Sequence, residues 1–243
     1  MQYLRHEEMK SGCSAQCNGN FESPWSKTIA SYGDEHSFFA FELNYNYDVQ
    51  GYKYGNDLIS ITIHNRQAIK NAEKYLDRPT IKSDQDSLVL SSPDGQRFIL
   101  LDRDVEKNED PIKCLSLNVS NLQKSFDYYT RLLKMNVDEQ QTQPNRLKLS
   151  YHSNGNSKWA FRLNNQCQLE LIETSEKIDR GTGYGRQAFS CPVKEIDEIQ
   201  KIVQKEGHGI LIPKMKLGGI LDLNKETVVI LSDPDGHEVR MCD

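Results

Sequence analysis

The sequence lacks the features that mark membrane, secreted and nucleic-acid-binding proteins. It has no apolar run near the roughly 20 residues that a membrane helix needs, and no run of lysine or arginine longer than a pair. The net charge is −5, so the basic surface that nucleic acids require is missing. The opening MQYLRHEEMKSG has neither the apolar core of a secretory signal nor the Arg/Ser-rich character of a transit peptide. We therefore expect a protein that stays inside the cell, with no nucleic-acid or membrane partner.

Cysteine is too sparse and too dispersed for a disulfide framework or an evident zinc site. The six cysteines are Cys13, Cys17, Cys114, Cys167, Cys191 and Cys242. Only Cys13 and Cys17 are close, and neither a histidine nor a second pair lies beside them at zinc-site spacing. Buried thiols are the expectation in a reducing compartment. The 37% hydrophobic and 27% charged content indicates a globular chain of one large domain or two modest ones.

A repeated motif is the strongest internal signal. SLVLSSPDGQRFIL occupies residues 87–100, and the similar VVILSDPDGHEVRM occupies 228–241. Because proline fixes φ and the following glycine permits positive φ, each Pro-Asp-Gly predicts a tight turn between two strands. FAFELNYNY (39–47) likewise resembles CQLELIETS (167–175), which matches Glu42 with Glu170. The two halves of the chain are therefore predicted to share one architecture.

Helical and extended patterns alternate along the chain. Three amphipathic helices are predicted: one over 66–76 with Asn65 as its cap, one that begins after Ser120 or Asn121, and one with an apolar stripe that ends before Gly207. Short alternating runs predict strands over 112–119, 159–165, 167–173, 187–192, 226–233 and 237–241. From residue 112 onward, the predicted elements follow the order β-α-β-β-β two times in succession. The residues before 102 follow the same double order, except that one part of it is missing.

A charged, aperiodic stretch divides the halves. DRDVEKNED covers residues 102–110, and Pro111 follows it. We predict a first domain over residues 1–104, a linker over 105–111 and a second domain over 112–243.

CLSLNVSNLQKSFDYYTRLLKM (114–135) combines a strand, an Asn-Leu cap and a helix with Ser-x-x-Tyr-Tyr. With the Pro-Asp-Gly turns, this stretch resembles the glyoxalase or vicinal-oxygen-chelate (VOC) superfamily. The resemblance implies an α+β fold in which tandem βαβββ modules form two cup-shaped mixed sheets, one from each half of the chain. Three further segments, GCSAQCNGNFESPWSKT, FELNYNYDVQGYKYGND and YGRQAFSCP, narrow the resemblance to one member of that superfamily.

The first module departs from the pattern. When the halves are aligned, residues 1–4 match residues 135–138, so the counterpart of roughly 112–134 does not appear. We therefore expect the first module to lack its opening strand and helix. A shortened isoform, a mis-assigned start codon and a trimmed chain all stay open. Unpaired backbone groups on a neighbouring strand would make the chain less stable than an extended form.

The superfamily implies a divalent metal held by His/Gln and Glu from the first and last strand of each module. The matching positions in this sequence are Glu42, Leu58 and Ile99 in the first half, and Cys114, Glu170, Arg186 and Arg240 in the second. Only Glu42 and Glu170 keep the family's ligand type. Leucine and isoleucine offer no lone pair, and arginine offers only donors. A divalent metal stays open as the one cofactor, although the sequence offers it only an incomplete ligand set; no other cofactor is predicted.

Two roles stay open for the second half. Arg186, Glu170 and Arg240 are expected to converge, either as a structural ion-pair network or as a pocket for a small anionic metabolite. The degenerate metal site favours a non-catalytic small-molecule-binding or scaffold protein. The alternative is a metal-dependent enzyme of the lactoylglutathione lyase or glyoxalase type. The resemblance further implies a cytoplasmic or mitochondrial location and a surface for protein partners.

Overall fold

The chain folds into four successive groups of strands and helices. The computed structural model describes residues 1–13, 15, 21–35, 37–75, 81–84, 86–139, 145–151, 167–183, 185–217 and 226–243. The first group has three strands, β1 (Gln2–Met9), β2 (Trp25–Ser31) and β3 (Ala40–Asn46). No helix belongs to this group in the described ranges.

Each of the other groups follows the order strand, helix, three strands, so the predicted α+β architecture of tandem βαβββ modules is confirmed. The second comprises β4 (Leu58–His64), α1 (Arg66–Tyr75), β5 (Ile81–Asp84), β6 (Ser87–Ser91) and β7 (Arg97–Leu101). The third comprises β8 (Ile112–Val119), α2 (Leu122–Phe126) with the π-helix η2 (Asp127–Leu132), β9 (Asn136–Glu139), β10 (Arg146–Ser150) and β11 (Gln168–Glu173). The fourth comprises β12 (Arg186–Ser190), α3 (Val193–Lys205), β13 (Ile210–Leu217), β14 (Glu226–Ser232) and β15 (Glu238–Cys242).

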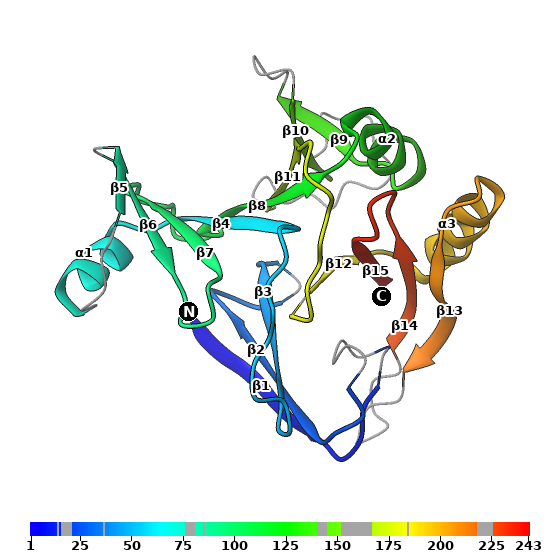
Figure 1. The fold of residues 1–243 in the computed structure, drawn as a ribbon, viewed down its shortest axis with the longest axis horizontal. Coiled ribbons are helices and arrows are strands. Elements are labelled where there is room, and N and C mark those ends of the chain that lie inside the picture. Colours follow the sequence, from blue (N-terminus) through cyan, green and yellow to red (C-terminus); the bar gives the residue numbers. More distant parts are fainter. Residues whose placement is uncertain are drawn as a thin grey trace.

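The strands form three sheets (Figure 1), in the orders β1-β2-β3, β5-β6-β7-β4-β8-β11-β10-β9 and β12-β15-β14-β13. Within a group the opening strand pairs in parallel with the last strand, as β4 does with β7 and β8 with β11. The opening strand of each group has no partner within its group on its other edge. β4 and β8, the opening strands of the second and third groups, pair with each other antiparallel along these edges. The second and third groups therefore share the eight-stranded sheet. The expectation that each half of the chain builds its own cup is wrong on this point.

Side chains that alternate along each strand separate an outer, helix-covered face from an inner face. On β8 and β11, Leu117, Leu169 and Leu171 pack with Tyr128 and Tyr129 of the neighbouring helix in the largest core cluster. The same cluster includes side chains of α3, β14 and β15, so the eight-stranded and four-stranded sheets share one apolar core. A second cluster joins Ala72 of α1 to the outer face of β4, β6 and β7.

The predicted helix ends are confirmed. Asn65 Oδ1 accepts a hydrogen bond from the Ala68 amide over 2.9 Å, and Asn121 Oδ1 accepts one from the Lys124 amide over 2.9 Å. Gly207 follows α3 with φ +76°. The helix after Asn121 is α-helical for little more than one turn and then widens into the π-helix.

The π-helical stretch has a packing consequence. The Leu133 amide donates to the carbonyl of Tyr128, five residues earlier, over 3.1 Å. Tyr128, Tyr129 and Leu132 of this wider turn lie in the core together, each almost fully buried.

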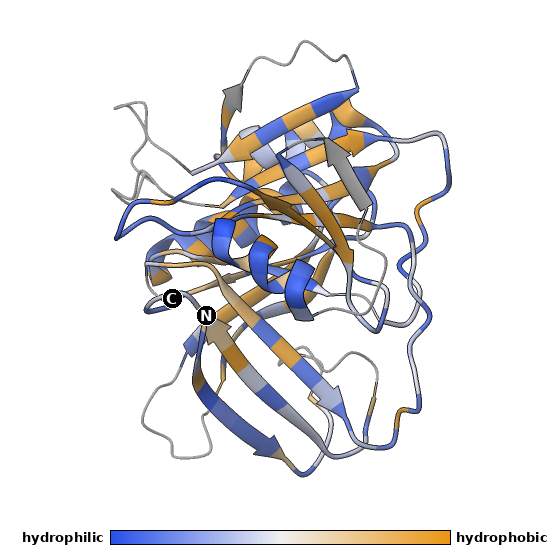
Figure 2. Ribbon diagram, turned by 90° about the vertical axis from the view of Figure 1, so that its left-hand side faces the viewer, coloured by the Kyte–Doolittle hydropathy of each residue, from blue (hydrophilic) through white to orange (hydrophobic). Residues whose placement is uncertain are grey.

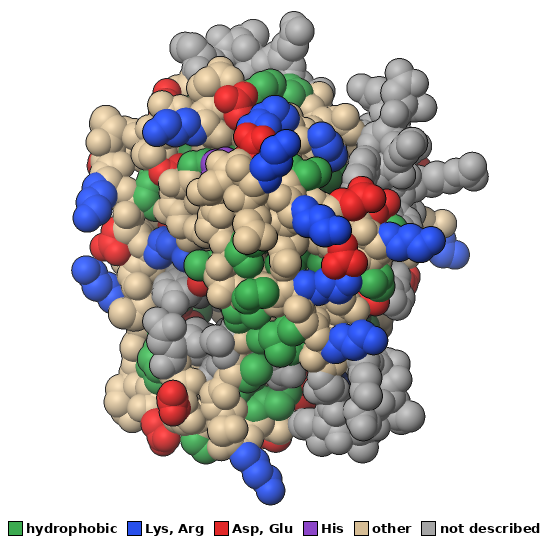
Figure 3. Space-filling view, turned by 90° about the vertical axis from the view of Figure 1, so that its right-hand side faces the viewer, with side chains coloured by type: hydrophobic (Ala, Val, Ile, Leu, Met, Phe, Trp, Pro, Cys, Tyr) green, Lys and Arg blue, Asp and Glu red, His purple; other side chains and the backbone are tan. Residues whose placement is uncertain are grey.

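The predicted and the observed strands differ in several places. The strand expected over 159–165 lies outside the described residues, and no residue range was predicted for β1, β2, β4, β5, β9, β10 and β13. On the side of α3 and β13, Lys and Arg side chains are interspersed with Asp and Glu (Figure 3). This mixture is typical of a solvated face. Within the described ranges, no helix is long and apolar enough to cross a membrane.

Candidate functional site

A row of polar side chains crosses the inner face of the eight-stranded sheet. Ser60 on β4 lies opposite Ser116 on β8, which lies opposite Glu170 on β11, which lies opposite Lys148 on β10. Residues in register across a sheet point to the same face. Because Leu115, Leu117, Leu169 and Leu171 pack on the outer face, these polar side chains point inward. The central positions of this row are deeply buried.

Glu170 is the acidic centre of this row, and both of its oxygens are engaged. The Ser116 hydroxyl donates to Oε2 over 2.6 Å. Arg146 Nη1 lies 3.4 Å from Oε1. The glutamate is 8% exposed, so these two groups replace the water that a carboxylate ordinarily binds. A metal ion at Glu170 would compete with both partners.

Cys114 lies two residues before Ser116 on β8, so its side chain points to the same inner face. Its Sγ is 3.9 Å from the Ser116 hydroxyl oxygen. Burial, reinforced by the negative charge of Glu170, raises the pKa of the Cys114 thiol to about 11. The thiolate is the form that binds metals and attacks electrophiles. Cys114 is therefore a neutral thiol at physiological pH, poorly suited to either task.

The two apolar positions of the predicted site differ in their placement. Ile99 lies opposite Thr62, which lies opposite Cys114, so Ile99 faces inward as predicted. Leu58 does not, because the register of β4 on β8 shifts between Leu58 and Ser60. Leu58 packs against the outer core cluster, and Ser60 takes the inward position.

The expected convergence of Arg186, Glu170 and Arg240 does not occur. Glu170 belongs to the eight-stranded sheet, whereas Arg186 and Arg240 lie on β12 and β15 of the four-stranded sheet. Arg186 donates to Glu238 Oε2 from Nε over 2.8 Å and from Nη2 over 2.6 Å. Arg240 forms an ion pair with Glu226. The prediction is wrong because it assigned β11, β12 and β15 to one cup.

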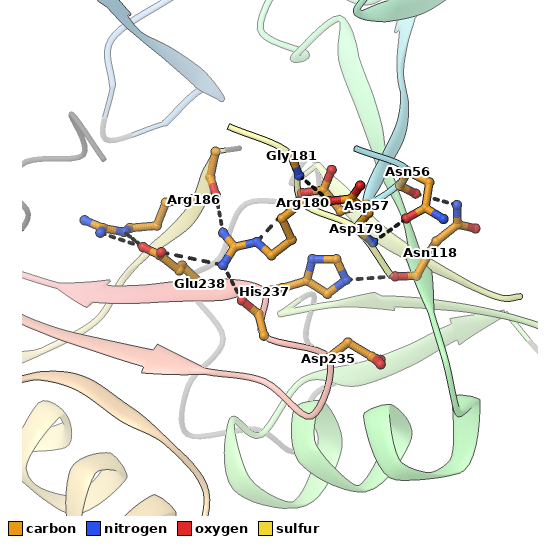
Figure 4. A network of polar contacts seen from close by, with 12 residues as sticks. Asn56, Asp57, Asn118, Asp179, Arg180, Gly181, Arg186, Asp235, His237 and Glu238 are labelled. Carbon is orange, nitrogen blue, oxygen red and sulfur yellow. Dashed lines mark hydrogen bonds and ion pairs between the residues drawn. The ribbon is translucent and has the colours of Figure 1, made fainter. Parts of the chain in front are cut away.

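Arg186 instead belongs to a network where several loops meet (Figure 4). Arg180 lies between Asp57 and Glu238, with Nε 3.9 Å from Asp57 Oδ2 and Nη1 3.6 Å from Glu238 Oε1. Arg180 also donates to the carbonyls of Gly185 and Gly236. The network ties the segment before β12 to the ends of β4 and β15. Sequence reasoning missed it, because its members have no common spacing.

Glu42, the other predicted metal position, lies on the three-stranded sheet. It shares the inner face of that sheet with Lys27 and Asn44. Its Oε1 is buried and has no hydrogen-bond partner in the described part of the chain. Glu42 and Glu170 therefore belong to different sheets, and neither completes a ligand set with the other.

In the described part of the chain, the inner face of the eight-stranded sheet brings few metal-binding groups together. The positions that the superfamily uses bring together a carboxylate already bound on both oxygens, a neutral thiol and an isoleucine. Among the described residues, no group of three or more His, Cys, Asp or Glu side chains is arranged to hold an ion.

Comparison with known proteins shows which family the chain belongs to. The family model described as "Glyoxalase domain-containing protein 4-like, C-terminal domain" matches residues 121–243. The chain is 41% identical over 241 residues to "Glyoxalase domain-containing protein 4" of Mus musculus, a match that covers 98% of this chain and 76% of the mouse protein. The chain belongs to the glyoxalase domain-containing protein 4 family. The resemblance drawn from the sequence motifs is confirmed.

One further relative and one solved structure are similar to the chain. The chain is 36% identical over 242 residues to "Glyoxalase 1" of Caenorhabditis briggsae, covering 98% of this chain and 78% of that protein. The crystal structure of glyoxalase I from Zea mays superposes with a TM-score of 0.74, covering 100% of this chain and 83% of that chain at 22% identity. At that identity the likeness establishes the shared glyoxalase fold alone.

Proposed function

We propose that this member of the glyoxalase domain-containing protein 4 family binds a small molecule on the inner face of the eight-stranded sheet and does not carry out metal-dependent catalysis. One observation carries the proposal. Glu170 is bound by Ser116 and Arg146, while Ile99 and the neutral Cys114 occupy the neighbouring ligand positions. Among the described residues, the face thus offers hydrogen-bonding side chains but no group of three or more His, Cys, Asp or Glu ligands for a metal.

The arrangement favours an anionic ligand. Arg146 Nε is buried and has no hydrogen-bond partner among the described residues. The side chain is 37% exposed, and one nitrogen already approaches Glu170. A guanidinium with donors to spare is the group that best binds a carboxylate or phosphate. Arg146 therefore takes the role that the sequence assigned to Arg186 and Arg240, whose ion pairs engage them elsewhere.

The test uses thermal unfolding with a panel of small carboxylates and phosphate esters. At least one should raise the Tm of the unmodified protein, because binding to the native state alone stabilises it. Arg146→Gln should abolish that shift. Arg131→Gln is the matched control, because Arg131 is 53% exposed and pairs with Glu206 away from the inner face. No shift with any compound, or an equal shift in the Arg146 variant, would contradict the proposal.

A metal-dependent glyoxalase-type activity is the second candidate. Glu42 supports it, because its buried Oε1 without a partner is an oxygen that a cation could use. The name of the nematode relative, "Glyoxalase 1", supports it too. Elemental analysis after incubation with zinc, nickel or manganese, combined with turnover of the methylglyoxal–glutathione hemithioacetal, separates the candidates. Stoichiometric metal and turnover, both lost in Glu42→Gln or Glu170→Gln, would favour the enzyme.

A further inference from the structure

The apolar side chains of β6 and β7 form two sets on opposite faces of the eight-stranded sheet. On the outer face, Leu88 and Leu100 are buried in the core cluster beside α1. On the inner face, Val89 lies opposite Ile99, and both side chains are partly exposed. Among the described residues, neither belongs to a core cluster. Figure 2 shows hydrophobic residues recurring along the strands beside α1. Val89 and Ile99 therefore form an apolar surface separate from the cores.

A row of uncharged side chains joins this apolar surface to the centre of the sheet. Ile99 lies opposite Thr62 on β4, and Thr62 lies opposite Cys114 on β8. Cys114 is a neutral thiol at physiological pH, and such a thiol behaves as a small apolar group. Thr62 is partly exposed and adds a methyl group. We call these four side chains, Cys114, Thr62, Ile99 and Val89, the apolar row.

Positive charge lies at the other side of the same inner face. Arg146 and Lys148 both point inward from β10. Arg146 Nη1 lies 3.4 Å from Glu170 Oε1, and its buried Nε has no hydrogen-bond partner among the described residues. Burial and the charge of Glu170 raise the pKa of the Cys114 thiol, whereas the charge of Lys148 lowers it, so this ammonium lies near the thiol. The cationic end therefore adjoins the beginning of the apolar row.

The distance between the two ends sets the size of a ligand that reaches both. The strands β11, β8, β4 and β7 are consecutive in the sheet (Figure 1), so three spacings separate β11 from β7. The guanidinium of Arg146 already reaches Glu170 on β11. Three spacings of about 4.8 Å give roughly 14 Å. An extended alkyl chain advances about 1.25 Å per carbon–carbon bond, so about 8 to 12 carbons span that distance.

We infer that the inner face of the eight-stranded sheet binds an amphipathic organic acid, with its acid group at Arg146 and its unbranched apolar tail along the apolar row. The inference rests on the proposed function, which places a small anion at Arg146, and adds the tail. The two ends of the face match the two ends of such a ligand. A guanidinium binds a carboxylate through paired hydrogen bonds, and each methylene that leaves water for the row stabilises the complex.

A homologous series of acids tests the tail. Butanoate, hexanoate, octanoate and decanoate are titrated into the unmodified protein by calorimetry. The Kd should fall about two- to fourfold for each methylene that contacts the apolar row. Decan-1-ol has a comparable tail without the acid group, and it should bind at least about tenfold more weakly than decanoate.

A dicarboxylate tests the far end of the face. Arg97 is exposed at the inward position of β7 next to Ile99, so a second acid group there would have a cation within reach. Decanedioate should nevertheless bind more weakly than decanoate, because its second carboxylate would lose water against Ile99 and Val89.

Two variants locate the two ends of the ligand. Arg146→Gln should weaken the binding of every acid about tenfold or more, because the guanidinium is lost. Ile99→Ser should lower the affinity for decanoate at least about tenfold more than the affinity for butanoate, because only the longer tail reaches this position. Leu211→Ser is the matched control, because Leu211 is 49% exposed on β13 of the four-stranded sheet. It should change neither Kd.

Amide chemical shifts of the unmodified protein give a measure that needs no variant. Butanoate should shift the amide signals of β10 and β11. Decanoate should shift these and also the signals of β4, β6 and β7, because its tail lies along the apolar row. Shifts by decanoate that stay within β10 and β11 would contradict the inference.

The outcomes separate this inference from the proposed function. Equal affinity for butanoate and decanoate, both weakened in Arg146→Gln, would support the proposed function and exclude the tail. Tighter binding of decanedioate than of decanoate would assign the far end to a second acid group and overturn the inference. Decanoate binding that survives both Arg146→Gln and Ile99→Ser would place the acid on another surface. Failure of every acid to bind would contradict the proposed function as well.

Discussion

The Ser116 hydroxyl donates to Glu170 Oε2 over 2.6 Å, across the parallel strands β8 and β11. The buried Glu170 carboxylate accepts a hydrogen bond from this hydroxyl and lies beside Arg146, so both of its oxygens have a partner. A metal ion could bind Glu170 only by displacing one of these partners. This contact therefore links the stability of the sheet to the chemistry of its inner face.

Replacing the donor should cost stability. Ser116→Ala leaves a buried carboxylate oxygen without its hydrogen bond, and the free energy of unfolding should fall by about 1–3 kcal/mol. Urea unfolding measures the loss. Ser190→Ala is the control, because Ser190 is an exposed strand serine on β12, and its loss should stay within about 0.5 kcal/mol. Equal losses in both variants would show that the contact is not stabilising.

The Arg180 network predicts a larger effect. Arg180→Met removes the cation between Asp57 and Glu238, whose side chains are 13% and 12% exposed, and leaves the carbonyls of Gly185 and Gly236 without their donor. Breaking a fully buried pair costs about 3–5 kcal/mol, so this partly buried one should cost about 2–4 kcal/mol. Arg131→Met removes an exposed pair with Glu206 and should cost less than about 1 kcal/mol. Thermal or urea unfolding of the two variants measures both losses. A larger loss in Arg131→Met than in Arg180→Met would contradict the stabilising role of the network.

Local chemistry made much of the fold predictable. The Pro-Asp-Gly turns have Gly95 at φ +96° and Gly236 at φ +87°, as the turn requires. Asn65 and Asn121 cap the helices they were assigned. Each of these features depends on a few neighbouring residues, so the sequence carries the information directly.

The pairing of strands from different groups could not be predicted in this way. That β4 pairs with β8 depends on which open edges meet in space, and no short motif records it. The expected cluster of Arg186, Glu170 and Arg240 failed for this reason, because its members lie in two sheets. The inward turn of Ser60 in place of Leu58 depends on a single register shift, which moves a side chain from one face to the other. Arg146 was missed because its strand, β10, was not predicted.

The buried thiol of Cys114 predicts an alkaline loss of stability. Its pKa is about 11 in the native protein against an ordinary value of 9.0. Between these values the unfolded thiol releases its proton while the native thiol keeps it, so the free energy of unfolding falls as the pH rises from 9 to 11. At about 1.4 kcal/mol per pKa unit, the loss should be of the order of 2–3 kcal/mol. Well below pH 9, where the thiol is protonated in both states, this group contributes almost no slope.

Cys114→Ala isolates that contribution from those of the buried tyrosines. Urea unfolding from pH 8 to 11 should give a steeper decline for the unmodified protein than for the variant, whatever their offset at pH 8. The comparison rests on slopes, because the variant also loses packing volume. Parallel profiles would show that Cys114 titrates alike in the native and unfolded states.

Two glycines allow the segments before β4 and β12 to cross at backbone contact. A Cβ on Gly55 would lie 1.7 Å from the Asp179 carbonyl oxygen, and one on Gly181, where φ is +59°, would lie 2.0 Å from the Lys53 carbonyl oxygen. Hydrogen bonds of 2.7 Å from Asn56 and Thr182 amides to those same carbonyls hold the crossing in place. Backbone atoms on both sides leave no flexible group that could move aside.

Gly55→Ala and Gly181→Ala should therefore each lower the free energy of unfolding by about 2–3 kcal/mol or more, since the two segments must separate to admit a methyl group. Gly51→Ala is the matched control in the same loop, because a Cβ there meets no atom within 4 Å. That substitution should be neutral or slightly stabilising, as it restricts the unfolded chain. Urea unfolding of the three variants measures the difference. If Gly55→Ala were as stable as Gly51→Ala, the two segments would not be in contact in solution.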